Sequence, residues 1–156
     1  MTESIEGIHN FLKLSDHIAT AGQPIENQFA AIKEAGYQTV VNLAPPGSTN
    51  AIPHEKDIVE SLGMDYVGIP VIWTNPTIED LDRFFAVINA NAEQQIFVHC
   101  AKNMRVSAFM YLYRCLHDRD NHQQAEQDLH RIWIPNETWQ AFIQRAIEYY
   151  RSDHLG

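Results

Sequence analysis

A cysteine, an arginine and a serine lie close together in the segment "IFVHCAKNMRVS", residues 96–107. Four residues separate Cys100 from Arg105, and Ser107 follows two positions after the arginine. A cysteine thiolate is a strong nucleophile, and a guanidinium binds two anionic oxygens at once. A hydroxyl stabilises such a thiolate, or helps it to act as the leaving group when the covalent intermediate breaks down. These groups are suited to nucleophilic attack on an oxyanion ester, with a covalent intermediate on Cys100.

The same segment has the pattern of a buried strand, a loop and a helix. "QIFVHC" is an apolar run of strand length, and Val106, Phe109 and Met110 recur at helical spacing after the loop. At the carboxyl end of a strand in an open α/β sheet, loop amides and a helix N-terminus converge on an anion. The same field favours the thiolate. A buried structural cysteine is the alternative for Cys100 taken alone, but its neighbours favour function.

Strand and helix patterns alternate along the rest of the chain. Strands are predicted over 38–44 and 64–71 as well as at "QIFVHC". Further helices are predicted over 25–35, 54–62, from Thr77 through Ile88, about 122–132 and 136–150, with a polar turn at "DRDN" (118–121). This order predicts an α/β fold: a central, mostly parallel sheet of four to five strands flanked by helices.

Length and composition set the limits of this fold and its partners. A chain of 156 residues is expected to form one domain, residues 1–156. The net charge of −9 argues against nucleic acid or anionic membrane as partners. Two cysteines make no disulfide framework, and no leader or membrane-spanning run is visible, so a cytoplasmic location is expected. No metal site or cofactor is indicated, and the oligomeric state is left open.

Residues from about 18 to 115 resemble the cysteine-dependent protein tyrosine phosphatase superfamily, especially small bacterial dual-specificity-like phosphatases, some classed as domains of unknown function. The resemblance rests on "TAGQP" (20–24), "EAGYQTVVNLAPPG" (34–47), "GMDYVGIPV" (63–71) and "VHCAKNMRVS" (98–107). It implies a phosphotyrosine-phosphatase-like fold and hydrolysis of a phosphate monoester through a cysteinyl-phosphate on Cys100. Catalytic roles would fall to Cys100, Arg105 and Ser107. The phosphate-binding loop would comprise His99, Cys100, Ala101, Lys102, Asn103, Met104 and Arg105.

The loop departs from the signature of that superfamily, in which five residues separate the cysteine from the arginine. Here there are four. Either the loop has lost a residue and Arg105 is the family arginine, or its length is kept and Val106 stands at the arginine position. In the second alignment Asn103 replaces the family glycine, and asparagine tolerates the left-handed conformation that glycine would adopt. We favour the second alignment, with Arg105 reaching the phosphate from the neighbouring position.

Two other functions remain open for the same loop. A cysteine followed, after four residues, by a basic residue also resembles the active loop of rhodanese-type sulfurtransferases. In that case Cys100 would carry a persulfide. A catalytically weak phosphate-binding module, a pseudophosphatase, would keep the loop without turnover. The upstream segments cover far more of the chain and favour a phosphatase acting on a phosphorylated protein or small molecule.

The general acid of such a phosphatase is not evident. The superfamily usually carries an aspartate about thirty residues before the cysteine, where this chain has "VIWTNPT" (71–77). Asp80 and Asp82 are the nearest weak candidates. Asp80 is well explained as a charge in the first turn of a helix, and Asp82 as a solvated helix residue. We therefore leave the acid unassigned and expect slow turnover or a need for an activated leaving group.

Overall fold

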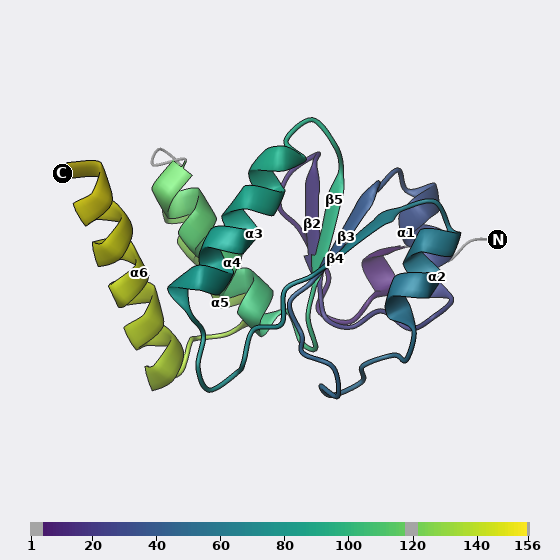
Figure 1. Cartoon of the computed structure of the whole chain (residues 1–156), viewed down its shortest axis with the longest axis horizontal. Helices are drawn as coiled ribbons and strands as arrows, with labels where there is room; N and C mark the ends of the chain where they lie inside the picture. The colour runs from purple at the N-terminus through teal and green to yellow at the C-terminus, as the bar shows by residue number, and fades with distance from the viewer. Residues whose placement is uncertain (1–4, 118–121, 156) are drawn as a thin grey trace.

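A five-stranded sheet crosses the middle of the protein (Figure 1). The computed structural model describes residues 5–117 and 122–155. Within them the strands pair in the order β1-β2-β5-β3-β4, and β1 alone runs antiparallel to its neighbour. Their bounds are β1 Leu12–Lys13, β2 Ile18–Ala21, β3 Thr39–Asn42, β4 Asp65–Gly68 and β5 Ile96–His99. The expected mostly parallel sheet is confirmed.

Helices cover both faces of this sheet, as parallel neighbours joined by crossover connections require. One face carries α1 (Gln28–Glu34) and α2 (Glu55–Ser61), and a short 3-10 helix, η1 (Ile5–Gly7), opens the described chain. The other carries α3 (Ile78–Ala90) and α4 (Met104–His117), with α5 (His122–Ile132) and α6 (Glu137–Leu155) beyond them (Figure 1). No helix in the described ranges combines the length and apolar character that spanning a bilayer needs.

The central strands divide their side chains between two apolar cores. Val41 and Val98 belong to the larger core, whereas their sequence neighbours Val40 and Phe97 belong to the smaller one. Successive residues of a strand point to opposite faces, so a strand covered on both sides must be apolar throughout. This explains why the predicted strands are continuous apolar runs rather than alternating ones.

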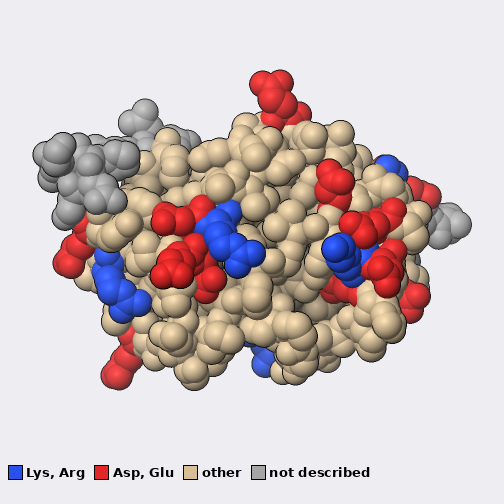
Figure 2. All heavy atoms as spheres, viewed as in Figure 1, with Lys and Arg blue, Asp and Glu red and all other residues tan. Residues whose placement is uncertain are grey.

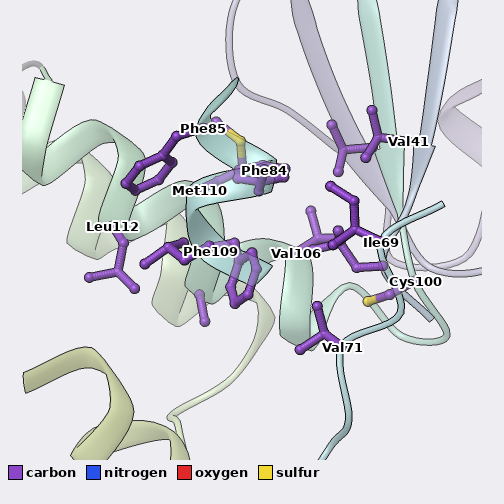
Figure 3. Packing of buried hydrophobic residues seen from close by; sticks show 14 of the residues in the cluster. Val41, Ile69, Val71, Phe84, Phe85, Cys100, Val106, Phe109, Met110 and Leu112 are labelled. Carbon is purple, nitrogen blue, oxygen red and sulfur yellow. The ribbon is translucent and has the colours of Figure 1, made fainter. Parts of the chain in front are cut away.

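Cys100 lies at the edge of the larger core. Figure 3 shows its sulfur near Ile69, Val71 and Val106, with Phe84 and Phe109 deeper in the cluster. The buried apolar residues of α3, α4 and α6 fill the rest of this core. The end of β5 and the start of α4 are therefore held by packing before any polar contact is considered.

Most element boundaries follow local signals. The Thr77 hydroxyl accepts a hydrogen bond from the Asp80 backbone N–H at 3.1 Å and caps α3, at the residue where the sequence predicts this helix to begin. Gly36 and Gly63, both with positive φ, follow α1 and α2. β1 and β2 were not predicted: β1 has only two residues, and two of the four residues of β2 are alanine, which is depleted in strands. The expected turn at 118–121 lies outside the described residues.

Acidic and basic side chains are interspersed on the face shown in Figure 2. Over α2 and over the α3 side of this face, the basic side chains lie directly beside acidic ones (Figure 2). The chain as a whole carries a net charge of −9. An anionic ligand therefore needs a cation that is kept apart from these carboxylates.

Candidate active site

The loop between β5 and α4 lines a cavity of about 450 Å³. Cys100 directly follows β5, and α4 begins at Met104. The loop that follows β3 and the one that follows β4 contribute further walls. The cavity is lined by Gly47, Ser48, Thr49, Trp73, Cys100, Ala101, Lys102, Met104 and Arg105. Most of the predicted loop residues thus surround one space. His99 and Asn103 are buried behind it.

Arg105 is the unusual group in this cavity. The residue is only 8 % exposed, and its buried Nε atom has no hydrogen-bond partner in the described part of the chain. The guanidinium carbon lies 5.6 Å from the centroid of the Trp73 ring, a cation–π contact. A buried charge is costly unless it is paired, so this environment favours an anion beside Arg105. The first amides of α4, which have no intrahelical acceptor, belong to residues that line the same cavity.

Asn103 turns the loop. Its φ of 67° is left-handed, and the side chain is fully buried. The Asn103 amide donates to the Asn10 carbonyl at 2.9 Å and to the Thr20 hydroxyl at 3.0 Å. In return the Asn10 amide donates to the Lys102 carbonyl at 3.0 Å. The segment around Asn10 therefore braces a turn that asparagine can adopt at modest cost.

Arg105 and Val106 point in different directions. Arg105 lines the cavity, whereas Val106 is fully buried in the larger core. Either alignment of the loop with the phosphatase signature therefore leaves Arg105 as the guanidinium at the cavity.

Ser107 lies away from the cavity at Cys100. Its hydroxyl donates to the Met104 carbonyl at 2.9 Å and accepts from Trp133 Nε1 at 3.0 Å. It lines a separate, narrow cavity together with Thr20 and Met110. The structure does not bring Ser107 to the nucleophile, and its catalytic role stays a prediction.

Neither weak candidate for the general acid lines the cavity. The Asp80 backbone N–H is bound to the Thr77 hydroxyl in the first turn of α3. The Asp82 carboxylate accepts a hydrogen bond from the Tyr150 hydroxyl on α6. Among the described residues that line the cavity there is no aspartate or glutamate. The general acid therefore remains unassigned.

A buried glutamate behind the loop was missed by the sequence reasoning. Glu55 Oε2 lies 2.7 Å from His99 Nε2, and the two residues are 5 % and 0 % exposed. Glu55 also accepts from Gln23 Nε2 at 2.7 Å and from Asn42 Nδ2 at 3.4 Å. The other ring nitrogen of His99 lies 3.3 Å from the Cys100 carbonyl oxygen. The network thus reaches the backbone of the loop.

His54, the residue before Glu55, has a strained backbone conformation. His54 has a left-handed φ of 62°, which a non-glycine residue seldom adopts. This conformation immediately precedes the buried first residue of α2. Such strain persists where surrounding contacts over-determine it, and the bonds to Glu55 are contacts of that kind. Glu55 is a first-turn residue of α2, a common place for an exposed carboxylate, so no local signal marks it as buried.

Gly22, in the segment "TAGQP", allows the loop to approach β2. A Cβ at this position would lie 2.7 Å from the Ala101 carbonyl oxygen and 2.8 Å from His9 Cδ2. The Gly22 N–H donates to the His9 carbonyl at 2.7 Å, and the Gln23 N–H donates to the Ala101 carbonyl at 3.0 Å. This close approach explains physically why glycine occupies the position.

Three tryptophans hold the far wall of the cavity. Trp73 contacts Trp133 and Trp139, with ring centroids 5.3 and 5.7 Å apart. Trp139, fully buried on α6, donates from Nε1 to the Trp73 carbonyl at 2.9 Å. The C-terminal helix therefore fixes the loop that places Trp73 against Arg105.

The second cysteine belongs to a different environment. Burial raises the pKa of the Cys115 thiol, and a hydrogen bond to Tyr111 opposes this shift in part. Its sulfur lies 3.0 Å from His122 Nδ1. Across the described residues, no group of three or more histidine, cysteine, aspartate and glutamate side chains is arranged to hold a metal ion.

Over residues 5–145 the chain matches the model of a family described as DSP-PTPase phosphatase fused to NAD+ kinase. The structure is similar to that of a candidate phosphatase from Shewanella putrefaciens, with TM-score 0.84, 35 % identity and coverage of 94 % of this chain and 96 % of that one. The catalytic core of the PP-IP phosphatase SIW14 from S. cerevisiae shares the fold at TM-score 0.71 and 18 % identity, covering 88 % and 85 % of the two chains.

A curated relative from Agrobacterium fabrum, a beta-lactamase hydrolase-like protein, is 31 % identical over 112 residues. The match covers 69 % of this chain and 26 % of that protein. This chain therefore spans about a quarter of the length of that relative.

Proposed function

Because this chain belongs to the family described as DSP-PTPase phosphatase fused to NAD+ kinase, within the cysteine-dependent protein tyrosine phosphatase superfamily, we propose that it hydrolyses phosphate monoesters with Cys100 as nucleophile. Arg105 binds the phosphate, and the loop from His99 to Arg105 surrounds it. The substrate is a phosphorylated small molecule or protein.

The observation that carries this proposal is the buried Arg105. It faces the same cavity as Cys100, and its Nε has no hydrogen-bond partner among the residues that the structure describes. A tetrahedral oxyanion offers two oxygens to a guanidinium in a planar, bidentate arrangement. The cation–π contact with Trp73 orients the guanidinium but supplies no negative charge. The site therefore gains most from an anion that also contacts the sulfur.

The proposed reaction has two steps. In the first, the Cys100 thiolate attacks phosphorus, an S–P bond forms, and the P–O bond to the leaving group breaks with its electron pair. Arg105 and the loop amides stabilise the charge on the equatorial oxygens. In the second, water attacks the cysteinyl-phosphate, the P–S bond breaks, and phosphate and the thiolate are released.

The leaving oxygen takes its proton from water, because no carboxylate lines the described cavity. Loss of a positioned general acid typically lowers the rate of proton transfer by about 10²–10⁴-fold. Activated esters, whose leaving oxygen is stable without a proton, should therefore be much better substrates than alkyl phosphates.

The test compares vanadate binding in Arg105→Ala, Arg105→Lys and the exposed control Arg83→Ala. Arg105→Ala should weaken vanadate binding by about 2–4 kcal/mol, since a charged partner is lost from a desolvated site. Arg105→Lys should recover only part of this, because an ammonium does not reproduce two parallel hydrogen bonds. Binding by Arg105→Ala that equals that of Arg83→Ala would refute the phosphate site.

Turnover separates the phosphatase from its two rivals. Hydrolysis of p-nitrophenyl phosphate that is lost in Cys100→Ser supports the proposal. Sulfur transfer from thiosulfate to cyanide without ester hydrolysis would instead identify a sulfurtransferase. Phosphate that protects Cys100 from alkylation without any turnover would identify a pseudophosphatase. Peptide mass spectrometry distinguishes Cys100 from Cys115 in the alkylation arm.

A further inference from the structure

A second hollow lies beside the candidate active site, at the same edge of the sheet. Its volume is about 600 Å³, and it lies at the carboxyl ends of β3 and β4, next to the start of α2. Its apolar lining comprises Pro45, Pro46, Ala51, Ile52, Pro53 and Pro70, and the ionisable residues His54, Glu55 and Lys56 line the side at the start of α2. The surface below α2 in Figure 2 is likewise largely uncharged. We refer to this space as the β3–β4 hollow. Its volume is that of a typical small-molecule site.

The β3–β4 hollow adjoins the cavity at Cys100. Gly47 and Ser48 line both spaces. β5, which carries Cys100, is the neighbour of β3 in the sheet, and neighbouring strands lie about 5 Å apart. A single ligand can therefore have its phosphate beside Arg105 and a flat group over β3. The phosphate cavity and the hollow are thus neighbours that share part of the loop after β3.

The Tyr66 hydroxyl is a hydrogen-bond donor in the hollow that has no acceptor among the described residues. Asn42 Oδ1 accepts from the Ala44 N–H at 2.9 Å, which fixes the amide so that Nδ2 donates to the Tyr66 hydroxyl at 3.1 Å. The Tyr66 oxygen is thus an acceptor in this bond, and its own proton is free to donate. Burial, and then the charge of Glu55, raise the pKa of Tyr66, so the phenol keeps that proton.

We propose that the β3–β4 hollow receives the leaving group of the substrate, and that the preferred substrates are small phosphate monoesters of flat aromatic or heteroaromatic alcohols. The apolar lining covers the faces of the ring system, and the Tyr66 hydroxyl donates to an acceptor on it. An aryl leaving group also suits the cavity at Cys100, where no carboxylate lies among the described lining residues, since an aryl oxide leaves more readily than an alkoxide. The proposal rests on the phosphatase function proposed above.

The test compares two aryl esters of similar reactivity, 4-methylumbelliferyl phosphate and p-nitrophenyl phosphate. The first has two fused rings and a carbonyl acceptor; the second has one ring. The measured quantity is the ratio of their kcat/KM values. Ala51→Trp fills the hollow from its exposed rim, Tyr66→Phe removes the donor, and Ala90→Trp places the same bulk at an exposed position on α3.

The wild-type protein should favour the two-ring ester. Ala51→Trp should lower the ratio by about tenfold or more, as removal of an apolar subsite does. Tyr66→Phe should lower it by a smaller factor through KM, and Ala90→Trp should leave it unchanged. Equal kcat/KM values for the two esters in the wild type, or equal losses for both in Ala51→Trp, would overturn the leaving-group site while leaving the phosphatase function standing.

A binding measurement keeps the two proposals separable. The free phenol 4-methylumbelliferone, added with vanadate, should bind with a fluorescence change that Ala51→Trp weakens and Ala90→Trp does not. If neither ester is hydrolysed, the phosphatase function is refuted, and this titration alone tests whether the hollow binds an aromatic ring system. Saturable binding that is lost in Ala51→Trp supports a ring-binding site there. No binding, or binding unaffected by Ala51→Trp, overturns it.

Discussion

Removal of the Glu55 carboxylate should destabilise the protein more than any exposed substitution on the same helix. In Glu55→Ala, three buried groups lose a hydrogen bond to the carboxylate: His99 Nε2, Gln23 Nε2 and Asn42 Nδ2. The two amides each keep one other acceptor, the Pro24 carbonyl and the Tyr66 hydroxyl. Two of the bonds to the carboxylate are 2.7 Å long and the third is 3.4 Å, so two losses dominate. A buried polar group left without a partner costs about 1–3 kcal/mol, and hydrogen bonds to a charged group lie toward the upper end of the range. For the two short bonds together we therefore expect a loss of about 3–5 kcal/mol in the free energy of unfolding.

Two further variants bracket this value. Glu55→Gln keeps the shape and one carbonyl acceptor but turns an amide toward a second donor, so it should lose about 1–2 kcal/mol. Glu60→Ala, at an exposed position of α2, should change the free energy of unfolding by no more than about 0.5 kcal/mol. Urea unfolding followed by tryptophan fluorescence supplies all three values, provided that the m-value stays constant.

The network should also matter to the site. His99 lies against the Cys100 carbonyl, so a displaced imidazole moves the backbone of the loop. Glu55→Gln, the milder variant, should remain folded and bind vanadate more weakly than Glu60→Ala does. A loss below about 1 kcal/mol in Glu55→Ala would show that the pair contributes little to stability and would refute the reasoning.

Three other substitutions or titrations test separate parts of the structure. Gly22→Ala places a Cβ 2.7 Å from the Ala101 carbonyl oxygen, so it should cost about 1–3 kcal/mol in thermal or urea unfolding and weaken vanadate binding; unchanged binding would mean that the loop does not depend on this approach. Val106→Ala should cost about 1–2 kcal/mol of stability and leave vanadate affinity intact, whereas a selective loss of affinity would place Val106 at the anion. Because burial raises the pKa of Cys115, its thiolate forms at higher pH than that of an ordinary thiol. Iodoacetamide should therefore label Cys115 in the folded protein at a higher pH than it labels Cys115 in the unfolded chain. The same pH midpoint of labelling in the folded and unfolded protein would contradict the burial.

The local parts of the site could be read from the sequence. Cys100 and Arg105 lie within six residues of each other, and a strand, a tight loop and a helix each leave a periodic pattern over that distance. Asn103 signalled a left-handed turn, because few other residues adopt a positive φ at low cost, and its φ is 67°. Thr77 signalled the start of α3 for a similar reason, since the cap bond joins residues three positions apart.

The long-range partners were decided only by the tertiary structure. Glu55 meets His99 across 44 positions, and Tyr150 reaches Asp82 across 68. The sequence predicts a catalytic role for Ser107, which stays a prediction, but only the structure shows that its hydroxyl is bonded to the Met104 carbonyl and to Trp133. Periodicity and capping report only what a segment does with its near neighbours. The packing of distant segments determines which carboxylate is buried, which hydroxyl faces a cavity and which loops line the same cavity. No local sequence pattern contains that information.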